Sequence, residues 1–60
     1  MNENLIGKLC NFAQTKHDGG LFWRHGRFMG ENPTHFLFEI EGKPSAFLRT
    51  EIARIEWEVD

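Results

Sequence analysis

Apolar and polar residues alternate along much of the second half of the chain. In residues 34–41 the large apolar side chains of Phe36, Phe38 and Ile40 fall at every second position. Residues 53–59 show the same period, with apolar residues alternating with charged ones. A period of two is that of a β-strand with one buried face, so the pattern predicts a strand at each place.

Glycine and proline residues separate further short apolar segments. His-Asp-Gly-Gly at residues 17–20 and Glu-Gly-Lys-Pro at residues 41–44 are typical of tight turns, because glycine tolerates positive φ and proline fixes its own φ. The segments beside these turns complete the expected elements, which are strands at residues 8–14, 21–30 and 45–49 and one helical turn at residues 50–52.

Five short strands within 60 residues indicate an all-β fold. The length fits one domain, expected to span residues 1–60, with a core that buries only about 60% of the unfolded surface. Five strands are too few for a two-layer sandwich, whereas a strongly bent antiparallel sheet that closes on itself covers its core and its edges together. We therefore expect a small SH3-like barrel that self-association helps to stabilise.

Gly26 lies inside the longest expected strand, where glycine usually marks a bulge or a bend. A bulge at this position shifts the side-chain register by one residue. The shift would turn Leu21 and Trp23 inward before Gly26 and Phe28 inward after it. It would leave the neighbouring positions outside, namely Phe22, Arg24, His25 and Arg27.

These exposed residues form the first candidate binding site. Arg24, His25 and Arg27 fall within four positions, beside the aromatic ring of Phe22. Single-stranded nucleic acid is bound by cations that follow the phosphates and by rings on which bases stack, each stack contributing about 1–3 kcal/mol. The alternative is that the arginines only keep a sheet edge soluble.

Four features follow one another along the chain: LIGKLCNF at residues 5–12, Asp-Gly-Gly at residues 18–20, Gly26, and FLRTEIARI at residues 47–55. In this order they resemble the Sm-like (Sm/LSm) family of SH3-like small barrels. The resemblance implies a homo-oligomer that binds single-stranded RNA, and it places His35 and Arg49 together in a nucleotide pocket. An exposed ion pair of Arg49 with Glu51 or Glu39 is the alternative for that arginine.

The last strands supply the candidate subunit interface. Edge strands leave backbone groups unpaired, and pairing with a second copy satisfies them. Phe47, Ile55 and Trp57 lie in these strands, and tryptophan is enriched at interfaces. The alternative is that Trp57 closes the core of its own chain.

Charge favours a second class of function. The net charge is −2. Residues 1–30 carry four Lys and Arg against two acidic residues, whereas residues 31–60 carry three against seven. The acidic half would repel phosphate, so the alternative is an SH3-like protein–protein interaction or inhibitor module without nucleic-acid binding.

Other chemistries find little support in the sequence. Cys10 is the only cysteine, so no disulfide forms within the chain, and the histidines are not spaced as metal ligands. No nucleophile motif or phosphate loop occurs, so we expect neither an enzyme nor a cofactor. No segment has the roughly 20 apolar residues of a membrane span, and the start lacks a signal-peptide pattern, so we expect a cytoplasmic protein without a membrane partner.

Overall fold

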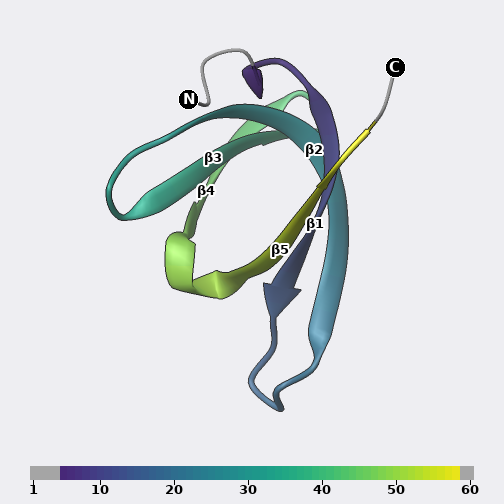
Figure 1. Ribbon diagram of the computed structural model, residues 1–60, viewed down its shortest axis with the longest axis vertical. Coiled ribbons are helices and arrows are strands. Elements are labelled where there is room, and N and C mark those ends of the chain that lie inside the picture. The colour runs from purple at the N-terminus through teal and green to yellow at the C-terminus, as the bar shows by residue number, and fades with distance from the viewer. Residues whose placement is uncertain (1–4, 59–60) are drawn as a thin grey trace.

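The computed structural model describes residues 5–58 and shows an all-β protein built on one five-stranded antiparallel sheet (Figure 1). The predicted class and all five predicted strands are therefore confirmed, and the predicted helical turn is a short 3-10 helix. Residue 59 of the predicted last strand lies outside the described residues. The elements are β1 (Leu9–Thr15), β2 (Leu21–Glu31), β3 (His35–Ile40), β4 (Lys43–Leu48), η2 (Arg49–Glu51) and β5 (Ile52–Trp57).

The strands are ordered β4-β3-β2-β1-β5, so β4 and β5 are the two edges and η2 connects them. The sheet is strongly bent, as Figure 1 shows. In a flat sheet β1 and β4 would be about 14 Å apart, three strand spacings. The ring centroids of Phe12 in β1 and Phe47 in β4 are only 5.4 Å apart. Within residues 5–58, however, no backbone ladder joins β4 to β5, so the expected closure into a hydrogen-bonded barrel is not observed.

Three phenylalanines from three strands form the centre of the core. Phe12, Phe28 and Phe38 are buried, together with Cys10. The rings of Phe12 and Phe38 are stacked, with centroids 3.9 Å apart. Each of these residues lies on the inward face that alternation along its strand predicts.

The three residues predicted for a subunit interface lie around this core. Phe47, Ile55 and Trp57 are partly buried and pack against it. The Trp57 ring meets the Phe28 ring edge-on, with centroids 5.3 Å apart. Their apolar surface therefore contributes to the fold of a single chain, and their role between subunits stays a prediction.

Gly26 does not form the predicted bulge. It pairs with Cys10 in an uninterrupted β1–β2 register, and the irregularity in β2 lies between Phe28 and Gly30. A Cβ atom on Gly26 would lie 2.8 Å from the carbonyl oxygen of Glu39. Gly26 is required because the backbone of β3 approaches it closely, not because the strand needs an extra residue.

Without a register shift at Gly26, the predicted orientations in the first part of β2 are wrong. Leu21 and Trp23 do not point into the core but are exposed. Phe28 is buried, as predicted. Arg24 lies on the same face as Gly26 and Phe28 and is partly buried, so it is not an outward-facing residue.

Because the thiol of Cys10 is buried, the free energy of unfolding depends on pH in the alkaline range. Burial, together with the negative charge of Glu58, raises the pKa of Cys10 from 9.0 to about 11. Above pH 9 the unfolded chain loses this proton while the folded chain keeps it, so ionisation favours unfolding until the folded pKa is reached.

We expect the free energy of unfolding to fall by about 2 kcal/mol between about pH 7.5 and pH 10.5 through Cys10 alone. Urea unfolding of the wild type and of Cys10→Ala at both pH values measures this effect. The alanine variant has lower stability throughout because of its smaller side chain, but it lacks the thiol contribution. A stability difference between the two proteins that does not change with pH would contradict the prediction.

Candidate functional site

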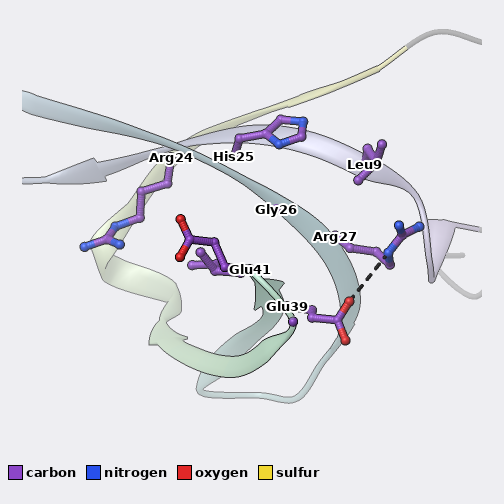
Figure 2. Close-up of a pocket in the computed structure, with 9 residues that line it drawn as sticks. Leu9, Arg24, His25, Gly26, Arg27, Glu39 and Glu41 are labelled. Carbon is purple, nitrogen blue, oxygen red and sulfur yellow. Dashed lines mark ion pairs between the residues drawn. The ribbon is translucent and has the colours of Figure 1, made fainter.

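The cluster predicted in β2 is divided between the two faces of the sheet. Because β2 continues in register through Gly26, successive side chains point to opposite sides. Figure 2 shows the side chains of Arg24 and His25 pointing away from each other. Phe22 and Arg24 share the inner face, and His25 and Arg27 share the outer face. The four residues therefore do not form one surface.

The contacts of Arg24 within residues 5–58 are all with neutral groups. Its Nε donates a hydrogen bond of 2.9 Å to Oε1 of Gln14. Its guanidinium carbon lies 4.8 Å from the ring centroid of Phe22 and 5.6 Å from that of Phe47. The arginine therefore bridges β2 and β4 through cation–π contacts, which stabilise by about 0.5–2 kcal/mol depending on how far they are desolvated.

The two outer-face residues, His25 and Arg27, each contact a carboxylate. Nε2 of His25 lies 2.6 Å from Oε2 of Glu58. Nε of Arg27 lies 3.7 Å from Oε1 of Glu39, and its Nη1 donates to the carbonyl oxygen of Gly7 at 2.7 Å. These contacts connect β2 to its neighbours, so a phosphate would have to compete with carboxylates already in place.

His35 and Arg49 lie at neighbouring positions, because the backbone N–H of Arg49 donates to the carbonyl oxygen of Thr34 at 2.9 Å. The Arg49 guanidinium is nevertheless directed to the carboxylate of Glu31 and lies 4.5 Å from the ring centroid of Phe36. Nδ1 of His35 contacts the Thr34 hydroxyl at 2.8 Å. The ion pair foreseen as an alternative for Arg49 exists, but its partner is neither Glu51 nor Glu39.

A pocket beside Gly26 carries charges of both signs (Figure 2). Arg24 and Arg27 approach it from β2, and Glu39 and Glu41 from β3 and the following turn. The Arg27–Glu39 pair is drawn as a dashed line. Two carboxylates and two guanidinium groups therefore line one pocket, which offers no uniformly positive surface to an anionic ligand. Its lining is Leu9, Arg24, His25, Gly26, Arg27, Glu39, Ile40, Glu41 and Gly42.

The end of the β1–β2 hairpin exposes large apolar side chains on both faces of the sheet, Phe22 on the inner face and Leu21 and Trp23 on the outer one. The three consecutive residues Leu21, Phe22 and Trp23, which we call the hairpin tip, are 46%, 50% and 45% exposed. In Figure 1 this hairpin extends beyond the other strands. Sequence reasoning placed Leu21 and Trp23 in the core, although three consecutive large apolar residues already depart from the alternation expected of a half-buried strand.

A cleft lies beside the hairpin tip, between the end of the hairpin and η2. The side-chain oxygen of Thr15 donates to the carbonyl oxygen of Glu51 at 3.4 Å and connects the two walls. We call this the tip cleft, and its lining is Gln14, Thr15, Lys16, His17, Phe22 and Glu51.

Two findings concern other kinds of site. Residues 5–58 contain no group of three or more His, Cys, Asp and Glu side chains placed to hold a metal ion. In the same part of the chain no helix has the length and apolar character needed to cross a membrane.

Fold and site together define a small all-β protein with an exposed aromatic hairpin end. Comparison of the chain with protein-family models, curated proteins and solved structures finds no match.

Proposed function

We propose that this chain is an SH3-like small-barrel module for protein–protein interaction and that its partner protein binds at the hairpin tip. The observation that carries the proposal is the exposure of Leu21, Phe22 and Trp23. Neighbouring apolar side chains of this size are rarely left in water on a monomer unless a partner covers them. Aromatic residues are also enriched at protein interfaces.

The barrel part of the proposal is supported by the strand order and by the bend of the sheet. The strand after η2 returns to the far edge of the sheet and pairs with β1. The contact between Phe12 and Phe47 crosses from β1 to β4. Side-chain packing therefore joins β1 to β4 across the bend, which supports the comparison with a partly open barrel.

Protein is favoured over RNA because of the ion pairs. Arg27, a predicted phosphate contact, and Arg49, predicted for the nucleotide pocket, already lie beside Glu39 and Glu31. RNA binding would break these pairs or bring phosphate next to carboxylate, at a net charge of −2. An apolar protein surface requires neither change.

Single-stranded RNA is the second candidate, and the Phe22–Arg24 pair favours it. A guanidinium stacked on an exposed ring, with neutral partners only, is a group on which a base can stack. In this case weak binding would centre on the inner face of β2, not on the divided cluster first predicted.

A second copy of the chain is a further partner within the proposal. Because Phe47, Ile55 and Trp57 pack on their own core, self-association would use the backbone of the edge strands β4 and β5. We place this module in the cytoplasm, where the lone thiol of Cys10 stays reduced.

Selection from a displayed library of random dodecapeptides tests the proposed function. We expect enriched peptides whose affinity falls at least about tenfold for Phe22→Ser and for Trp23→Ser, because loss of a central aromatic contact typically costs 2 kcal/mol or more. Met29→Ser is the matched control, since Met29 is a similarly exposed apolar residue elsewhere on β2.

Two results would contradict the proposal. The first is a selection that enriches no peptide, or only peptides that bind all three variants as well as the wild type. The second is binding of oligouridine at low salt that weakens steeply as salt is raised, which would indicate nucleic acid as the ligand.

A further inference from the structure

The two cations nearest to Phe22 have unused hydrogen-bond donors. Arg24 uses only its Nε, toward Gln14, so no acceptor within residues 5–58 contacts its two terminal nitrogens. The Lys16 ammonium has no carboxylate within ion-pair distance in the same range. The remaining arginines each lie beside a carboxylate, Arg27 beside Glu39, Arg49 beside Glu31 and Arg54 beside Glu56.

The acidic groups near the tip cleft do not serve these cations. Oδ1 of Asp18 accepts the backbone N–H of Gly20 at 2.9 Å. Oε1 of Glu51 accepts the backbone N–H of Leu48 at 2.9 Å. Each of these carboxylates therefore accepts a hydrogen bond from a backbone N–H close to it in the sequence. The donors of Lys16, which lines the cleft, and of Arg24, which lines the pocket beside Gly26 and stacks on Phe22, therefore stay available to a ligand that brings acceptors.

The geometry of Arg24 specifies the kind of acceptor. With Nε engaged by Gln14 and the ring of Phe22 against one face, the guanidinium offers the edge formed by its two terminal nitrogens. A carboxylate fits such an edge with two parallel hydrogen bonds. Lys16, on the hairpin wall of the cleft, offers a point charge for a second carboxylate.

Apolar groups surround these donors. Phe22 lines the cleft, and Leu21 and Trp23 are exposed on the opposite face of the same hairpin end. A ligand that covers this surface needs apolar side chains between its charges. A nucleic acid carries a charge on every nucleotide and does not offer this spacing.

We infer that the partner presents an acidic segment, in which Asp or Glu side chains alternate with large apolar ones, to the tip cleft and to Arg24, which lies beside the cleft against Phe22. One carboxylate binds the terminal nitrogens of Arg24, another pairs with Lys16, and the apolar side chains cover Phe22. This inference rests on the proposed function and adds the chemistry of the partner to it.

Charge reversal tests the inference on the dodecapeptides selected against the full chain. We expect the enriched peptides to contain Asp or Glu next to Leu, Phe or Trp. Lys16→Glu should weaken their binding by about fivefold or more, since one exposed ion pair accounts for up to about fivefold and the reversed charge adds repulsion. Replacing Asp and Glu in a peptide by Asn and Gln should weaken binding to the wild type similarly.

Lys43→Glu is the control, because it changes the net charge equally at the exposed start of β4. We expect it to leave peptide affinity unchanged within about twofold, since screening limits the reach of a surface charge to about 10 Å. Arg24→Lys keeps the charge but not the two-nitrogen edge, and it should weaken binding by about threefold or more.

The outcomes separate this inference from the proposed function. Peptides that require Phe22 and Trp23 but are neutral or basic, or that bind Lys16→Glu as well as wild type, overturn the inference and leave the proposed function standing. A selection without tip-dependent peptides overturns both. Tight oligouridine binding that Lys16→Glu abolishes overturns the assignment to an acidic protein segment and identifies RNA as the ligand of the cleft.

Discussion

Phe38→Ala is expected to leave most of the protein unfolded at room temperature. Phe38 is completely buried, its ring is stacked on that of Phe12, and it meets Phe28 and Phe47 edge-on. Truncating a buried phenylalanine to alanine costs about 3–5 kcal/mol through lost transfer energy and the cavity that remains. A core in a chain below about 70 residues rarely supplies more than about 3–5 kcal/mol, so the loss matches the whole stability of the fold.

Urea titration followed by near-ultraviolet circular dichroism measures this loss. Phe22→Ala is the control, because it removes the same atoms from a half-exposed ring. We expect it to cost about 1 kcal/mol or less, mainly through the contact with Arg24. If Phe38→Ala unfolds cooperatively at the same urea concentration as the wild type, the stacked phenylalanines are not the centre of the core.

Gly26→Ala is expected to destabilise the protein by about 2–3 kcal/mol, within the range measured for overpacked interiors. The added Cβ would lie 2.8 Å from the carbonyl oxygen of Glu39 and 3.3 Å from Cγ1 of Ile40. The first neighbour is backbone in a paired strand, so it cannot rotate away. Relieving the contact requires β2 and β3 to separate where the sheet bends.

Gly26→Ala is informative because its expected effect on stability is opposite to that of the same substitution in an ordinary strand. In an ordinary strand, alanine is more favourable than glycine by about 0.5–1 kcal/mol, because glycine loses more backbone entropy on folding. Gly20→Ala is the matched control, since its Cβ would approach side chains and no backbone, with Oδ1 of Asp18 at 3.2 Å and Cδ of Lys16 at 3.8 Å. We expect its stability to stay within about 0.5 kcal/mol of the wild type.

Thermal unfolding of the two glycine variants beside the wild type gives the comparison. A Gly26→Ala protein as stable as the wild type would mean that the backbone of β3 does not approach Gly26 as closely as the structure has it.

Local sequence was sufficient to predict the strands and the centre of the core. The alternation around Phe36 and Phe38 predicted β3, and the turn after it forms where Glu41 and Gly42 both have positive φ. Such a turn suits a two-residue hairpin connection because its twist matches that of the strands. Periodicity and turn chemistry act over a few residues, so they can be read without knowing the rest of the fold.

The candidate site was harder to predict because it depends on which residues meet across the sheet. The partner of Arg49 is Glu31, 18 positions away, and His25 meets Glu58, 33 positions away. Neither pairing follows from spacing along the chain. The exposure of Leu21 and Trp23 also depends on how far the hairpin extends beyond its neighbouring strands, a property of the sheet as a whole.

The all-β class, the positions of the strands and turns and the burial of the central phenylalanines follow from local sequence. The close approach of a neighbouring backbone to Gly26, the pairing of most arginines with carboxylates within residues 5–58 and the exposure of an aromatic hairpin end are seen only in the folded chain. Backbone preferences and apolar periodicity act over a few residues, whereas side-chain pairing and exposure depend on the bend of the sheet, which brings distant residues together.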